Sequence, residues 1–246
     1  MRPVIWIPFM ITLIISCKKS EDRICMKSTG EWDSLVIPLT PFNSISLGKN
    51  LVFELVQDST DKVVVLGGRN LLNQVKVSVL QGLLEIRNEN KCNFLRSYKK
   101  KITIEIHFTG LSKIVFEGTE KLYSRGKLKF EWLDFLIRDG AGSVKLDFDA
   151  KRVYATISQG WGDFTFSGST HYANLNVRNN GYCDLIGMNV YDSLTIISNT
   201  QGDIKVSANG IKLNAESLAD GDIFYKGNPS AINFKQLSGG KLIQIK

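Results

Sequence analysis

Apolar residues recur in two-spaced pairs along the second half of the chain, and the pairs return about every 20 residues. A spacing of two is the periodicity of a strand that buries one face. One set of pairs is Leu175 and Val177, Leu194 and Ile196, Leu213 and Ala215, and Ile232 and Phe234. The other set is Val144 and Leu146, Phe164 and Phe166, Ile204 and Val206, and Ile223 and Tyr225. Each repeat is therefore predicted to hold two short strands.

A glycine-containing turn separates the strands, and the residue after it serves as an anchor that aligns the repeats. The anchors are Ser143, Asp163, Asp184, Asp203, Asp222 and Lys241, with steps of 20, 21, 19, 19 and 19 residues. In one repeat Cys183 stands where the others carry the glycine. A fixed period near 20 is typical of stacked repeats. We expect an all-β parallel β-helix, with glycines where the backbone turns sharply or adopts a positive φ.

The chain between residues 35 and 108 alternates as strands do but lacks the repeat. Predicted strands cover Ile45–Leu47, Leu51–Val56, Val63–Leu66, Val75–Val79, Leu83–Ile86 and Ile102–Phe108. We expect this part to form a less regular N-terminal β layer that closes one end of the stack, because an open end would leave the core in water. Residues 109–246 would then supply the repeat coils.

The first 16 residues have the pattern of a signal peptide. Arg2 precedes an apolar run from Val4 to Ile15, which is too short to span a bilayer as a helix. The run ends in Ile14-Ile15-Ser16-Cys17, which resembles a bacterial lipobox, so we predict lipidation of Cys17. An ordinary signal peptide with a chance cysteine is the alternative. The polar residues after Cys17, up to residue 34, are expected to form a tether.

Composition narrows the range of partners. The 246 residues carry a net charge of +7, and 43% of them are apolar, which is ample for a core. The excess charge is lysine scattered through strand patterns, where it usually solubilises or blocks sheet edges. Because no recognition motif accompanies this charge, we expect no nucleic-acid partner.

The order of motifs resembles the putative auto-transporter adhesin head GIN domain, a bacterial family of unknown function. The matching segments, which span about 35–246, are Phe42-Asn-Ser-Ile45, Gly68-Arg-Asn-Leu-Leu72, Gly82-Leu-Leu-Glu-Ile86, the repeated Gly-Asp turns, Tyr225-Lys-Gly-Asn-Pro229 and Leu237-Ser-Gly-Gly240. The resemblance implies a right-handed parallel β-helix and a lipoprotein or secreted protein of the cell envelope. It implies little about mechanism.

Catalytic and metal-binding signals are sparse. His107 and His171 lie far apart, without a partner at metal-ligand spacing. The sequence contains no nucleophile elbow and no phosphate-binding loop. We therefore expect a non-catalytic protein without cofactor or metal, and keep a polysaccharide-active β-helix enzyme as the alternative.

Four aspartates occupy the anchor position: Asp163, Asp184, Asp203 and Asp222. Stacked coils would bring successive anchors about 5 Å apart. They are interpreted as turn residues that hydrogen-bond the backbone, with a calcium ladder as the alternative. A glycosidase needs two carboxylates in different environments, and equivalent turn positions do not supply that difference.

Trp161 and Tyr182 both precede an anchor by two residues, so they are expected at one corner in successive coils. They pack at the corner or form a stacking platform for sugars or for a partner's apolar surface.

Three cysteines remain besides Cys17. Export to an oxidising compartment permits pairing, and Cys25 and Cys92 both lie in the irregular N-terminal part. We predict a Cys25–Cys92 disulfide with Cys183 free. The sequence as a whole predicts a lipid-anchored outer-membrane protein, on the periplasmic face or the surface, that binds a glycan or an envelope protein or serves a structural role.

Overall fold

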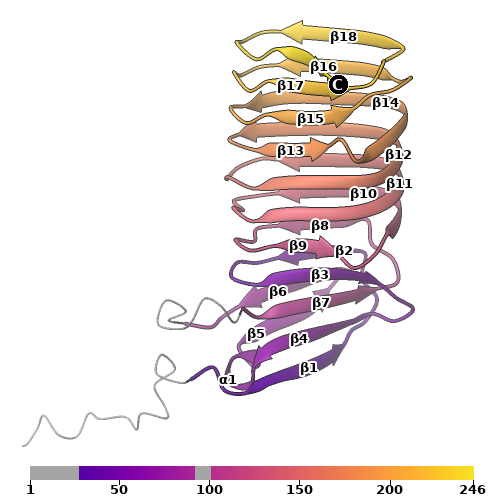
Figure 1. Cartoon of the computed structure of the whole chain (residues 1–246). Helices are drawn as coiled ribbons and strands as arrows, with labels where there is room; N and C mark the ends of the chain where they lie inside the picture. Colours follow the sequence, from indigo (N-terminus) through magenta and orange to yellow (C-terminus); the bar gives the residue numbers. More distant parts are fainter. Residues whose placement is uncertain (1–27, 92–100) are drawn as a thin grey trace, which may run out of the picture.

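The computed structural model describes residues 28–91 and 101–246, which form a stack of β-coils (Figure 1). The N-terminal elements are β1 (Trp32–Pro38), β2 (Ser44–Leu47), β3 (Val52–Gln57), β4 (Lys62–Gly68), α1 (Arg69–Leu72), β5 (Val75–Leu80), β6 (Leu83–Asn88) and β7 (Thr103–Phe108). The stack continues through β8 (Lys113–Phe116), β9 (Leu122–Ser124), β10 (Leu128–Ile137), β11 (Ser143–Ile157), β12 (Asp163–Asn179), β13 (Tyr182–Leu185), β14 (Met188–Thr200), β15 (Ile204–Ser207), β16 (Lys212–Ser217), β17 (Ile223–Lys226), β18 (Ala231–Gln236) and β19 (Leu242–Ile245).

Two parallel ladders run the length of the coils. One ladder joins β8, β10, β11, β12, β14, β16 and β18, and the other joins β9, β11, β12, β13, β15, β17 and β19. The long strands β11 and β12 belong to both ladders. The result is a β-solenoid of about seven turns, which confirms the predicted parallel β-helix.

Inward apolar side chains stack from coil to coil. The register places Ile157 between Ile137 and Val177, and all three are fully buried. Phenylalanines fill the middle of the stack, where the Phe166 ring lies 5.1 Å from that of Phe135 and 5.2 Å from that of Phe148. Burying one such ring contributes roughly 1.5–3 kcal/mol.

Antiparallel strands close the N-terminal end. β4 pairs antiparallel with both β1 and β7, and β5 forms an antiparallel hairpin with β6. Parallel pairing nevertheless begins at β2, which pairs with β6 and β8, and at β3, which pairs with β7 and β9. The coils therefore start earlier in the chain than the repeat is visible in the sequence.

The register corrects the alignment around Cys183. Tyr182 lies opposite Asp163, and Cys183 lies between Phe164 and Ile204 with its side chain fully buried. Cys183 is thus a core residue, and the corner glycine of this coil is Gly181. The expectation that Cys183 replaces the glycine and that Asp184 is the anchor is wrong, because the small apolar thiol fills an inward position.

Close approach explains the corner glycines better than a positive φ does. A Cβ on Gly202, Gly221 or Gly240 would lie 2.3 Å from the carbonyl oxygen of the corner glycine one coil below. None of these three has a positive φ, whereas Gly160 does, at 101°. At the corners of the last coils, the stacking distance itself excludes a side chain.

The signal peptide, Cys17 and the predicted Cys25–Cys92 disulfide lie outside the described residues. Cys183 is free, as predicted. Among residues 28–91 and 101–246, no helix is long and apolar enough to cross a membrane.

Candidate functional site

Exposed aromatic side chains gather on the outer surface of β10, β11 and β12. Trp132, Tyr154 and Tyr172 are 47%, 41% and 40% exposed. Strand alternation turns them outward, because their neighbours in sequence, such as Leu133, point into the core. The ladder places Trp132 opposite Arg152 and Arg152 opposite Tyr172, so the three lie one above another. We call Trp132, Arg152, Tyr154 and Tyr172 the aromatic face.

Arg152 lies over one of these rings. Its guanidinium carbon is 5.2 Å from the centre of the Tyr172 ring, the geometry of a cation–π contact. The four residues of the aromatic face, together with Glu131 and Lys151, line an open hollow of about 390 Å³. Lys151 forms an ion pair with Glu131.

A second hollow, of about 290 Å³, continues from the first and shares Glu131 and Lys151 with it. His171 and Tyr191 border it, with ring centres 5.5 Å apart, and His171 Nδ1 lies 3.0 Å from Asp192 Oδ2. The register between β12 and β14 shifts here, so that Tyr191 and Asp192 together face His171. Such bulges re-aim side chains, and this one carries Tyr191 to the surface.

The sequence held a signal for the aromatic face that its analysis missed. Trp132, Arg152 and Tyr172 are spaced by the repeat length of 20 residues. The glycine turns mark the repeat more visibly, whereas these three residues stand in the middle of the coils.

Trp161 and Tyr182 do not occupy one corner position in successive coils. Tyr182 lies opposite Asp163, two residues beyond Trp161, so the prediction of one shared corner position is wrong. Trp161 is 73% exposed. Tyr182 lies under Lys205, whose Nζ is 5.7 Å from the ring centre. A binding role for either residue stays a prediction.

The aspartate ladder is shorter than expected. Asp163, Asp203 and Asp222 lie on one line with Tyr182 between the first two, while Asp184 pairs with Thr165 and Lys205 two residues further along. Three of the four accept hydrogen bonds of structural character. Asp163 Oδ2 accepts one from Ser143 Oγ at 2.8 Å, Asp184 Oδ1 one from Ile186 N at 2.9 Å, and Asp222 Oδ1 one from Lys241 N at 2.8 Å.

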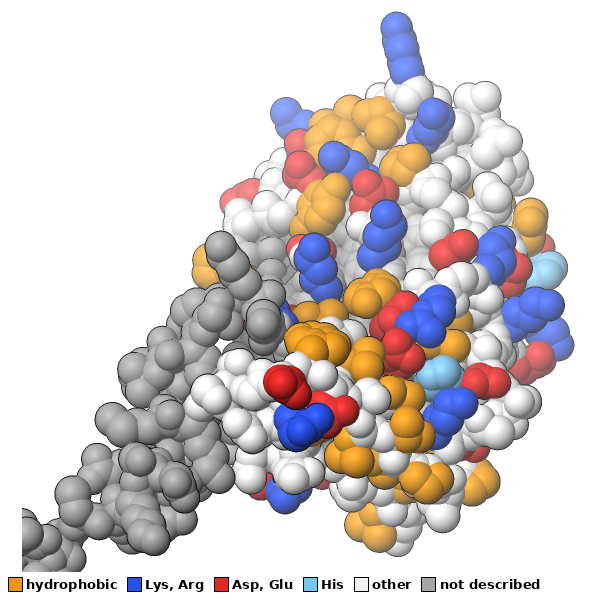
Figure 2. Space-filling view, turned by 60° about the horizontal axis from the view of Figure 1, so that its bottom comes forward, with side chains coloured by type: hydrophobic (Ala, Val, Ile, Leu, Met, Phe, Trp, Pro, Cys, Tyr) orange, Lys and Arg blue, Asp and Glu red, His pale blue; other side chains and the backbone are white. Residues whose placement is uncertain are grey.

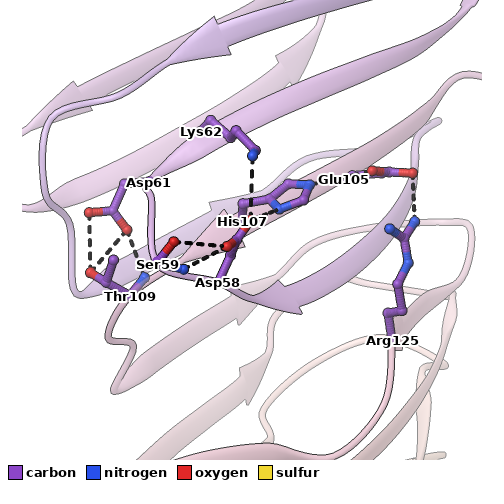
Figure 3. Close-up of polar contacts among 8 residues, drawn as sticks. All are labelled: Asp58, Ser59, Asp61, Lys62, Glu105, His107, Thr109 and Arg125. Carbon is purple, nitrogen blue, oxygen red and sulfur yellow. Dashed lines mark hydrogen bonds and ion pairs between the residues drawn. The ribbon is translucent and has the colours of Figure 1, made fainter.

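A polar cluster that the sequence did not predict surrounds His107 near the N-terminal end (Figure 3). His107 is 9% exposed; its Nδ1 lies 2.8 Å from Asp58 Oδ2, and its Nε2 lies 3.4 Å from Glu105 Oε2. Asp58 also accepts a hydrogen bond from Ser59 N at 2.6 Å and pairs with Lys62 at 3.4 Å. The Ser59 N–H, followed by the His107 ring, lowers the pKa of Asp58 to about 2.

Arg125 continues this cluster across two strands. Its Nε and Nη2 donate to the two carboxylate oxygens of Glu54 at 2.8 and 2.7 Å, and Nη2 also donates to Glu105 at 2.6 Å. These bonds raise the pKa of Arg125. The carboxylates are therefore occupied in joining β3, β7 and the turn before β10, which marks the cluster as structural.

Charges of both signs are interspersed on the surface. In the space-filling view, basic and acidic side chains lie beside one another over much of the visible face, with hydrophobic patches between them (Figure 2). Among the described residues, no group of three or more His, Cys, Asp or Glu side chains could hold a metal ion.

Solved structures share this fold. A putative adhesin from Bacteroides fragilis is 21% identical, with a TM-score of 0.79 over 87% of this chain and 97% of its own. A putative lipid binding protein from Parabacteroides distasonis is 17% identical, with a TM-score of 0.67 over 89% and 98% of the two chains. A putative adhesin from Parabacteroides merdae is 17% identical, with a TM-score of 0.59 over the same shares. At these identities the likeness concerns the fold.

No curated protein sequence matches the chain. The family model described as "Putative auto-transporter adhesin, head GIN domain" matches residues 41–229, which is most of the sequence and includes the whole aromatic face. The resemblance seen in the motifs is thereby confirmed, and the chain belongs to the putative auto-transporter adhesin head GIN domain family.

Proposed function

We propose that this protein is a lipid-anchored protein of the cell envelope that binds glycans, without cleaving them, through the aromatic face. The observation that carries the proposal is the stack of Trp132, Arg152 and Tyr172 beside an open hollow of about 390 Å³. Aromatic rings offer flat apolar area to the C–H faces of sugars, and nearby polar groups can meet the hydroxyls.

Binding is favoured over catalysis because of the carboxylates near the hollow. Glu131 is paired with Lys151. Asp134 lies opposite Tyr154 on the neighbouring strand and is paired with Lys113 at 2.9 Å. The Glu131 side chain is 71% exposed and that of Asp134 is 35% exposed. Glycoside cleavage needs one carboxyl kept protonated by its surroundings and a second kept ionised. Two ion-paired acids that both remain in contact with solvent do not supply that difference, so nothing here favours the polysaccharide-active enzyme.

Anchoring rests on the lipobox-like end of the leader and on the names of similar proteins. Ile14-Ile15-Ser16-Cys17 is followed at once by polar residues. The family and two of the similar structures are named putative adhesins. The described chain enters the stack at β1, and β10 to β12 lie several coils further along (Figure 1). A lipid on Cys17 would therefore hold the stack by its N-terminal end and leave the aromatic face accessible at the outer membrane.

The binding role is tested with the full chain, purified in detergent, on a glycan array. We expect specific glycans to be retained by the wild type and lost in Trp132→Ala and Tyr172→Ala. Trp161→Ala removes an equally large exposed ring elsewhere and should bind like the wild type. Retention that survives both aromatic-face substitutions, or an array without any binding, would refute the proposal.

The anchor is tested separately in cells. Wild-type protein should fractionate with membranes and carry lipid mass on the peptide that begins at Cys17. Cys17→Ala should release the protein or leave an unprocessed precursor. Wild-type protein without lipid and free of membranes would overturn the anchoring.

A further inference from the structure

We propose that the aromatic face selects acidic polysaccharides, and that Arg152 binds the carboxylate of a uronic acid unit in them. This inference rests on the proposed glycan binding and adds the ligand class and the residue that reads it.

Arg152 carries a charge that the protein itself does not neutralise. Lys151, which lines the same hollow, is occupied by Glu131. Within residues 28–91 and 101–246, no carboxylate forms an ion pair with Arg152, and its guanidinium contacts the face of Tyr172. A guanidinium stacked on a ring keeps the N–H groups at its edge free for a ligand. The face therefore presents an unpaired cation held in one orientation.

The neighbours of Arg152 suit a sugar that carries a carboxylate. Trp132 and Tyr172 flank it in the ladder, at about the 5 Å strand spacing, and Tyr154 lies two residues along on the same side. A pyranose ring can lie against Trp132 or Tyr154 while its carboxylate receives two parallel N–H bonds from Arg152. Arginine matches a planar carboxylate in this bidentate way, and a lysine at the same place would not.

The second hollow extends the site for a polymer. It continues past Glu131 and Lys151 and is lined by Lys129 as well. The acid on its wall, Asp149, is already held by Lys127 and by Ser169 Oγ at 2.7 Å. Lys129 thus provides another cation for the next acidic unit of a chain. Two adjoining hollows, each with a basic residue, fit a repeating anion better than a single charged sugar.

The test uses the full chain in detergent and ligands that differ only in charge. Polygalacturonate, alginate and hyaluronan are compared with their methyl esters at one ionic strength. We expect at least one of the acids to bind about tenfold more tightly than its ester, the range that charged hydrogen bonds supply. Arg152→Gln should remove that difference, because it should lower the affinity for the acid and leave the affinity for the ester unchanged. Arg152→Lys should recover only part of it.

Lys212 provides the matched control, because it is exposed and stands on the same outward row two coils above Tyr172. Lys212→Gln changes the net charge equally and should leave affinity within about twofold of the wild type. Equal affinity for acid and ester in the wild type overturns the acidic selectivity while glycan binding stands. The selectivity is also overturned if Lys212→Gln and Arg152→Gln lower the affinity equally. The same holds if dextran sulfate binds more tightly than the uronic acid polymers and Arg152→Gln leaves that binding unchanged. If no acid or ester binds, the acidic selectivity falls, and the glycan array decides separately whether glycan binding stands.

Discussion

The Nδ1 atom of His107 lies 2.8 Å from Oδ2 of Asp58, although 49 residues separate the two in sequence. The contact joins the turn after β3 to the end of β7, and Lys62 and the Ser59 N–H reach the same carboxylate. On the neighbouring side of the turn, Asp61 accepts hydrogen bonds from Thr109 N and Oγ1 at 2.8 and 3.2 Å (Figure 3). These bonds hold the β3–β4 turn against the end of β7.

The Asp58 contacts predict a loss of stability in acid. The pKa of Asp58 falls from 3.8 to about 2 on folding, so its charged form stabilises the native state above pH 3.8. That contribution is lost as the pH falls toward 2. Asp58→Asn should lower the melting temperature at pH 7, and its difference from the wild type should shrink between pH 4 and pH 2. Thermal melts by circular dichroism measure this. Asp134→Asn removes a carboxylate paired at the surface and serves as control; a constant difference for Asp58→Asn across this range contradicts the prediction.

The stacked corner glycines predict a steric cost for any side chain. A Cβ on Gly221 would lie 2.3 Å from Gly202 O and 2.6 Å from Thr200 O, both backbone atoms that cannot turn aside. Gly221→Ala should destabilise the fold by about 1–3 kcal/mol, the usual cost of overpacking. Gly110→Ala is the control, since its Cβ would meet nothing within 4 Å. Urea denaturation that shows equal stability of the two variants would be incompatible with the corner packing.

The anchor aspartates are expected to act through hydrogen bonds without calcium. Asp222 Oδ1 accepts a hydrogen bond from the Lys241 N–H at 2.8 Å, and an asparagine oxygen can accept the same bond. Asp222→Asn should therefore melt close to the wild type, while Asp222→Ala should lose about 1 kcal/mol. Melts in calcium and in chelator should coincide for all three proteins. A calcium-dependent rise of many degrees that Asp222→Asn abolishes would restore the calcium ladder.

Cys183 should be chemically inert in the folded protein. Its side chain is fully buried, and burial followed by the nearby Asp184 charge raises the pKa of its thiol. Reaction needs the thiolate and access to it. Alkylation followed by mass spectrometry of the Cys183 peptide should show labelling only at denaturant concentrations that unfold the chain. Labelling in native buffer would place Cys183 at the surface and reject its core position.

The sequence predicts the coils well because two-residue alternation and a near-constant step determine which side chains face inward. Leu194, Ile196 and Leu213 point inward, as their spacing requires. The alignment failed at Cys183 because cysteine fits a small corner and an apolar core equally well, and only burial decides between them. The contact of His107 with Asp58 could not be predicted from the sequence, because no repeat relates distant residues in the irregular first coils. The aromatic face was readable in principle, from outward residues spaced by one full coil.

The central claim, that glycans bind at the aromatic face, is tested most directly by the fluorescence of Trp132 alone. The chain has four tryptophans, and replacing Trp6, Trp32 and Trp161 with Phe leaves Trp132 as the reporter. Titration with a glycan that the wild type retains should shift or quench the Trp132 emission, and the change should saturate at the wild-type Kd. A companion variant that keeps only Trp161 should show no change. The account would be contradicted if the glycan left the emission of Trp132 unchanged and altered that of Trp161.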